Sequence, residues 1–182
     1  VLSVVDRYDA DHVNTLADPL LHRVYDNQRR SAALLVGYAG GDANLLRQRL
    51  PRETVWAVIQ HLKLGLFMLD EDSQFDPTGL LIRSDIPRSA VLWTLLHAGM
   101  IEGLDELFDP VGPDSPILRR ELDTERFWYV LRRYLPEEAP TFSVWADPDL
   151  QQLQADQLRT WYLMNRARLS FDQNARRFVL TR

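Results

Sequence analysis

The chain has 182 residues, a hydrophobic share of 46%, a charged share of 26% and a net charge of −5, as expected of a soluble globular protein of one-domain length. It contains no cysteine, which excludes disulfides, thiolate zinc sites, iron–sulfur clusters and cysteine nucleophiles. Its longest apolar run, Leu64 to Leu69, is too short to cross a bilayer. We therefore expect no membrane insertion, and the compartment, cytoplasm or organelle matrix, stays open.

Charge is distributed unevenly along the chain. Residues 70–114 carry ten acidic residues and two arginines, whereas residues 159–182 carry six arginines and one acidic residue, Asp172. Every basic residue except Lys63 is an arginine. The excess has two explanations that the sequence leaves open: genome base composition, or a need for forked contacts that lysine cannot make.

The spacing of apolar residues predicts helices nearly throughout the chain. The first runs from Pro19 towards Ala39, with Asp18 as its N-cap, and ends at Gly40-Gly41, which suit a left-handed C-cap. Asp42 then caps a short helix through Leu50.

Pro51 opens the most apolar segment, which extends to Leu69 and is apolar on all sides. Such a helix is enclosed by others, and we expect Trp56, Ile59, Leu62 and Leu66 to face them. A polar loop follows over residues 70–79, and Leu80 to Ile82 form a short extended piece.

Three further segments complete the predicted fold. A helix runs from about residue 85 to Phe108, a linker covers 110–116, and a helix capped by Asp123 or Thr124 ends before Pro136. The last helix starts at Asp147, and its predicted buried stripe consists of Leu150, Leu153, Leu158, Trp161, Met164 and Ala167. We therefore predict an all-α, compact multi-helix domain spanning residues 1–182, with the proline-rich stretch 136–148 as its candidate hinge.

Two segments align at an offset of 36 residues: Pro51-Arg52-Glu-Thr-Val55…His61 and Pro87-Arg88-Ser-Ala-Val91…His97. Periods of this length are typical of stacked helical hairpins. Residues 87–110 resemble a pentatricopeptide-type hairpin, in which the first helix follows a proline and a glycine turn, here Gly99, precedes the second. The resemblance covers residues 51–110 and implies stacked hairpins. The segment from Pro51 lacks a clear second helix. We therefore transfer no base-reading residues from the resemblance to this chain.

The acidic loop contains Asp70, Glu71, Asp72 and Asp76, whose spacing is similar to that of a calcium loop. Phe75 occupies the position that needs glycine, and Leu81 the position of the closing glutamate. We interpret the loop as a solvated acidic surface that meets a partner, and we predict no metal site.

The four histidines, His12, His22, His61 and His97, form no close ligand pair. His61 and His97 adjoin apolar residues and are predicted to be partly buried and structural. His97 with Glu102 and Asp105 is the one candidate acid–base cluster. No cofactor-binding loop and no nucleophile–base motif is present, so we assign neither catalytic residues nor a cofactor.

The C-terminal arginines are the leading candidate for binding an anionic partner surface: Arg159, Arg166, Arg168, Arg176 and Arg177. We predict a non-catalytic helical interaction module, an adaptor or structural subunit of a larger protein assembly. The alternative is a nucleic-acid-binding helical protein that uses these arginines, which the net negative charge disfavours. An enzyme whose site assembles only in the tertiary structure is the third hypothesis.

The acidic loop gives a first testable prediction. Because the loop lacks the glycine and the closing glutamate, millimolar calcium should leave the melting temperature unchanged. Differential scanning fluorimetry with and without calcium measures this. A clear rise in melting temperature that Asp72→Asn abolishes would contradict it.

Overall fold

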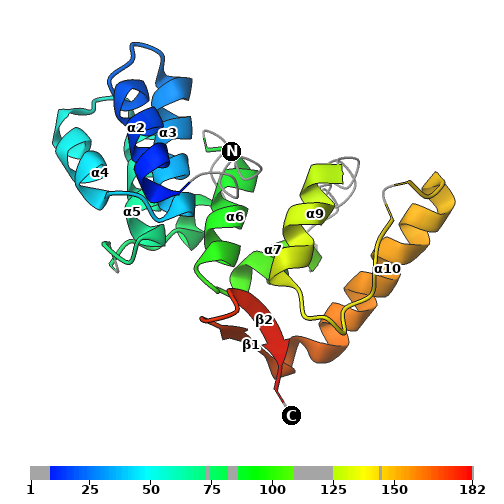
Figure 1. Ribbon diagram of the computed structural model, residues 1–182. Helices are drawn as coiled ribbons and strands as arrows, with labels where there is room; N and C mark the ends of the chain where they lie inside the picture. The colour runs from blue at the N-terminus through cyan, green and yellow to red at the C-terminus, as the bar shows by residue number, and fades with distance from the viewer. Residues whose placement is uncertain (1–8, 73, 82–85, 109–124, 144, 182) are drawn as a thin grey trace. The chain divides into compact units, whose positions relative to one another are not determined.

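A computed structural model describes residues 9–72, 74–81, 86–108, 125–143 and 145–181 (Figure 1). Within these ranges the chain forms eight α-helices and one two-stranded antiparallel sheet, which confirms the predicted all-α class. The helices are α2 (Ala10–Leu21), α3 (Asp26–Ala39), α4 (Ala43–Arg49), α5 (Trp56–Met68), α6 (Arg88–His97), α7 (Glu102–Phe108), α9 (Glu125–Tyr134) and α10 (Pro148–Asn165). Short 3₁₀ helices are η1 (Leu50–Arg52), η2 (Thr78–Leu80) and η3 (Arg166–Arg168), and the strands are β1 (Leu169–Asp172) and β2 (Arg177–Leu180).

The chain divides into two compact units, residues 1–94 and 95–182, and the boundary falls inside α6. The candidate hinge at 136–148 lies within the second unit. Compactness alone does not show whether a unit folds independently, so the single domain and its hinge stay predictions. The predicted linker 110–116 and the caps Asp123 and Thr124 lie outside the described residues.

The first helix of the first unit begins earlier than the sequence predicted. Asp9 caps α2 by accepting a hydrogen bond from the His12 amide at 2.9 Å. Pro19 therefore lies inside the last turn of α2 and does not start a helix. The predicted helix from Pro19 begins instead at Asp26, because the chain turns between the two helices at residues 22–25.

The predicted end of α3 and the start of α4 are confirmed. Gly40 takes the left-handed conformation, with φ +66°, and the Gly41 amide donates to the Val36 carbonyl at 2.9 Å. Glycine adopts this conformation without the strain that a Cβ would introduce. Asp42 caps α4 by accepting from the Asn44 amide at 2.9 Å.

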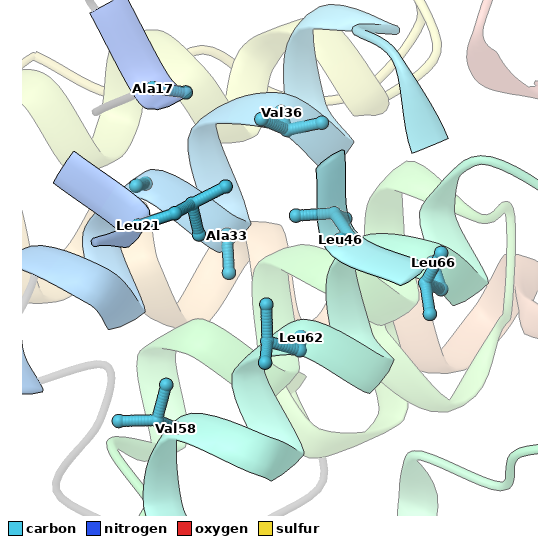
Figure 2. Packing of buried hydrophobic residues seen from close by; sticks show 9 residues of the cluster. Ala17, Leu21, Ala33, Val36, Leu46, Val58, Leu62 and Leu66 are labelled. Carbon is cyan, nitrogen blue, oxygen red and sulfur yellow. The ribbon is translucent and has the colours of Figure 1, made fainter. Parts of the chain in front are cut away.

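The core of the first unit lies between α2, α3, α4 and α5, and Figure 2 shows its side chains gathered among these helices. Its buried members are Ala17, Leu21, Ala32, Ala33, Val36, Leu46, Val58, Leu62 and Leu66. Helix α5 starts at Trp56, and Pro51 lies in the preceding 3₁₀ helix η1. The predicted helix start at Pro51 is therefore wrong. Leu62 and Leu66 are buried as predicted, while Trp56 in the first turn is 36% exposed.

Helices α3 and α5 approach through two glycines. A Cβ atom on Gly37 would lie 2.8 Å from the Gly65 Cα, and one on Gly65 would lie 2.6 Å from the Ala33 carbonyl oxygen. Both distances are shorter than real Cβ contacts. The two backbones therefore pack together directly, at a separation that no larger residue permits.

One carboxylate, that of Glu53, joins three segments of the first unit. Its oxygens accept hydrogen bonds from Arg29 at 2.8 and 3.2 Å and from the Thr54 and Val55 amides at 3.0 Å each. Arg49 donates to it at 2.8 and 3.2 Å. Arg29 also donates to the carbonyls of Arg23 and Val24 at 2.8 and 2.6 Å, so the turn after α2 is tied to the same group.

These bonds determine the pKa of Glu53. Burial raises it, but the hydrogen bonds from Val55, Arg49, Arg29 and Thr54 outweigh burial and lower the pKa from 4.5 to about 2. A lowered pKa means that the carboxylate contributes its full stability above pH 4.5. That contribution is lost as the pH falls towards 2.

Two helices, α6 and α7, replace the single helix predicted over 85–108. Helix α6 ends at His97, and Gly99 turns the chain with φ +74° into α7. The Met100 amide donates to the Leu95 carbonyl at 2.9 Å across this turn. A helix–glycine–helix arrangement is therefore present here, and the pentatricopeptide resemblance itself stays a prediction.

The hairpin of β1 and β2 was not predicted. Leu169 pairs with Leu180 and Asp172 with Arg177, and the Asp172 carboxylate accepts from the Asn174 and Ala175 amides in the turn. Phe171 packs on Phe178 at a centroid distance of 5.1 Å. The predicted extended piece at residues 80–82 is also wrong at Leu80, which lies in η2.

The Glu53 contacts give the second prediction. Glu53→Gln should lower the free energy of unfolding by about 3–5 kcal/mol at pH 7, because Arg29 keeps its charge and loses its buried partner. Urea unfolding at pH 7 and pH 3 measures this. Between pH 4.5 and 2 the free energy of unfolding should fall further in the wild type than in the variant.

Glu71→Gln is the matched control. Glu71 also pairs with an arginine, Arg47, but both side chains are partly exposed, so its loss should be below about 1 kcal/mol. Equal losses for the two variants would contradict the role given to Glu53.

Candidate protein-interaction face

Helix α10 begins where the sequence predicts. Asp147 is its N-cap and accepts from the Leu150 amide at 2.9 Å, and Pro148 occupies the first turn. The helix has 18 residues, a length of about 27 Å. It is therefore long enough to present separate faces to the interior and to solvent.

The inner face of α10 is fixed by Tyr162, which is fully buried together with Leu158. The Tyr162 ring lies 4.9 Å from the Phe108 ring, and its hydroxyl donates to Asp105 Oδ1 at 2.7 Å. Arg166 donates to both oxygens of the same carboxylate. Arg159 donates to the Phe108 carbonyl at 3.0 Å, so α10 is held against α7 along two turns.

The titration of this cluster follows its hydrogen bonds. Burial raises the pKa of Asp105, but the bonds from Arg166 and Tyr162 outweigh it and hold the pKa below its ordinary value. Burial and the bond to Asp105 raise the pKa of Tyr162. Asp105 is therefore a charged acceptor and Tyr162 a neutral donor at neutral pH.

The outer face of α10 is also apolar, and the predicted buried stripe is wrong there. Leu150, Leu153 and Met164 are 41%, 52% and 78% exposed. The step of five residues from Leu153 to Leu158 rotates by about 140° around the helix. The leucines before that step therefore face away from α7, and Leu158 faces it.

We call the outward set the α10 outer stripe. It consists of Leu150, Leu153, Gln157, Trp161 and Met164. These positions fall within about 80° of the helix circumference, and Trp161 is the half-buried member. Trp145, just before the helix, is 82% exposed. Large apolar side chains gathered on one solvent-facing strip make this face a candidate for contact with another protein.

The structure places the five predicted arginines in contacts within the second unit. Besides Arg159 and Arg166, Arg168 donates to the Thr181 carbonyl at 3.2 Å. Arg177 donates to Glu137 at 3.1 Å and to the Leu135 carbonyl at 3.0 Å. Arg176 lies with its Nη2 3.2 Å from His97 Nε2. Four of the five guanidinium groups therefore donate to an acceptor within their own unit, and the fifth, that of Arg176, contacts the His97 ring.

The predicted acidic surface belongs to the first unit. Asp70, with φ +58°, lies two residues after the end of α5, and Glu71 pairs with Arg47. The Asp72 carbonyl accepts from the Phe75 amide at 3.2 Å. Asp76 accepts from the hydroxyl and amide of Thr78 at 2.6 and 2.9 Å, which lowers its pKa.

The two inner histidines are placed as the sequence suggests. His61 is buried and bonds the Ala57 carbonyl at 2.7 Å, and burial lowers its pKa. His97 is half-buried, with Nδ1 3.3 Å from the Tyr134 hydroxyl. Asp105, expected in a cluster with His97, bonds Tyr162 and Arg166.

The described part of the chain contains neither a candidate metal cluster nor a candidate membrane-spanning helix. No three histidine or acidic side chains among the described residues group so that they could hold a metal ion. None of the described helices is both long enough and apolar enough to span a membrane.

Comparisons with protein-family models, with curated proteins and with solved structures found no match in any of the three.

The inner face of α10 gives the third prediction. Tyr162→Phe should lower the free energy of unfolding by about 1.5–3 kcal/mol, because it removes a hydrogen bond to a charged acceptor. Urea unfolding of the full chain measures this. Tyr25→Phe, at an exposed tyrosine, is the control and should change stability by less than about 0.5 kcal/mol.

Proposed function

We propose that the protein is a non-catalytic helical interaction module, an adaptor or structural subunit of a larger protein assembly. The observation that carries the proposal is the exposure of the α10 outer stripe. The hydrogen bonds of Tyr162, Arg159 and Arg166 fix the opposite face of α10 inward. The stripe therefore cannot be buried by rotating the helix without breaking them.

The contacts of the arginines also support a protein partner over nucleic acid. A guanidinium group that reads a phosphate backbone needs its donors directed outwards. Arg159 and Arg177 instead direct donors at carbonyl groups of their own chain, and Arg166 grips Asp105. The net charge of −5 further opposes nonspecific approach to a polyanion.

The outer stripe is tested by a pair of substitutions on the same helix. Leu153 and Leu163 are 52% and 49% exposed, but Leu163 lies about 120° from the centre of the stripe. Tagged wild type, Leu153→Asp and Leu163→Asp are each purified from the native source, and mass spectrometry identifies the chains that co-elute. We expect a co-eluting protein that Leu153→Asp releases and Leu163→Asp retains.

The nucleic-acid alternative predicts a different result. If the C-terminal arginines held phosphates, the affinity for single-stranded RNA or DNA would fall steeply with salt. Each lost arginine would then reduce the salt slope by about one unit. We expect negligible binding at physiological salt. Submicromolar binding that weakens in Arg168→Ala and Arg176→Ala would overturn the proposed function.

A further inference from the structure

We infer that the α10 outer stripe binds the same stripe of a second copy of this chain, with the two helices antiparallel. The inference rests on the proposed function and names its partner. The geometry and the charge pattern that support it come from residues of α10 and of the turn that follows.

The spacing of the stripe is the same in both directions along the helix. From Leu150 the steps to Leu153, Gln157, Trp161 and Met164 are three, four, four and three residues. A two-fold axis through Gln157 would therefore place Leu150 against Met164 of the second copy. It would likewise place Leu153 against the second copy's Trp161. In such an isologous interface every contact is made twice.

The residue on the axis suits this arrangement. Gln157 is exposed and is the polar member of the stripe. Its side-chain amide carries both a donor and an acceptor. Two copies of Gln157 that meet on the axis can therefore hydrogen-bond to each other. A carboxylate or an ammonium group at this position would repel its symmetry mate.

The charges at the two ends of α10 select the antiparallel orientation. Asp147 and Asp149 lie at the N-terminal end, and Arg166 and Arg168 follow the last turn. Antiparallel helices bring each acidic end to a basic end and also oppose the helix dipoles favourably. A parallel pair would place acid against acid. Asp156 lies beside the stripe. Its carboxylate accepts a hydrogen bond at 3.0 Å from the Gln152 amide, which lies on the side away from the stripe.

The size of the stripe sets the expected affinity. It extends about 21 Å along the helix, which is smaller than a standard protein interface. Association is therefore expected in the micromolar range, and the protein should pass from monomer to dimer as its concentration rises from about 1 to about 200 μM.

Sedimentation velocity of the full chain over that range tests the inference. Leu153→Asp should raise the dissociation constant at least about tenfold, whereas Leu163→Asp should leave it unchanged. Asp149→Arg and Arg168→Asp should each weaken association, and the double variant should restore it, because the swap recreates opposite charges across the axis.

Oxidative cross-linking gives an independent readout, because the chain contains no cysteine. Gln157→Cys should form a disulfide-linked dimer on mild oxidation, since the two copies of residue 157 meet on the axis. Leu163→Cys should not. Cross-linking of both variants to the same extent would overturn the proposed geometry.

The failures of the inference and of the proposed function can be told apart. The inference alone is overturned if the wild type stays monomeric at every concentration while a protein other than this chain co-elutes with it and is released by Leu153→Asp. A monomer whose melting temperature falls on Leu153→Asp and not on Leu163→Asp, and which releases no partner, overturns both. In that case another part of the same chain covers the stripe.

Discussion

Guanidinium groups that donate to backbone carbonyls hold together the irregular parts of both units. Arg29 binds two carbonyls of the turn after α2, and Arg132 binds those of Pro136, Glu137 and Ala139. Arg159 and Arg177 do the same at Phe108 and Leu135. The planar fork has five donors, so it can serve several acceptors at once, which an ammonium group on a flexible stem does less well. The arginine excess thus has a structural use, whatever the base composition of the genome.

The two faces of α10 connect this internal bonding to function. The polar groups of α10 that bond α7 lie on the inner face, around Tyr162, and the largest exposed apolar residues lie outside. A helix held only by apolar contacts could rotate to bury whichever stripe is larger. Here three directional hydrogen bonds to Asp105, one from Tyr162 and two from Arg166, prevent that rotation. The molecule therefore keeps Leu153 and Met164 exposed to water, a pattern typical of surfaces that dock another protein.

Sequence reasoning succeeded where local chemistry decides the structure. The caps Asp42 and Asp147 and the left-handed Gly40 depend on one or two residues, and all three are placed as predicted. It failed where distant residues compete. Asp-Pro at 18–19 has the form of a helix start, but Asp9 starts the helix earlier. The inner and outer faces of α10 could not be separated, because the choice between Leu153 and Leu158 is made by Asp105, far away in the chain. The five-residue step between those leucines was the available signal.

The Glu53 carboxylate also has a consequence for motion. Its two oxygens accept from two arginines and two backbone amides, so a displacement of Glu53 breaks these bonds together and leaves the buried Arg29 without its charged partner. The segment from Arg49 to Val55 and the turn after α2 should therefore open as one unit. Hydrogen exchange at the Thr54 and Val55 amides would then report the opening of a turn some thirty residues away. The connection between α4 and α5, two helices labelled in Figure 1, thus shares the stability of the helices that it joins.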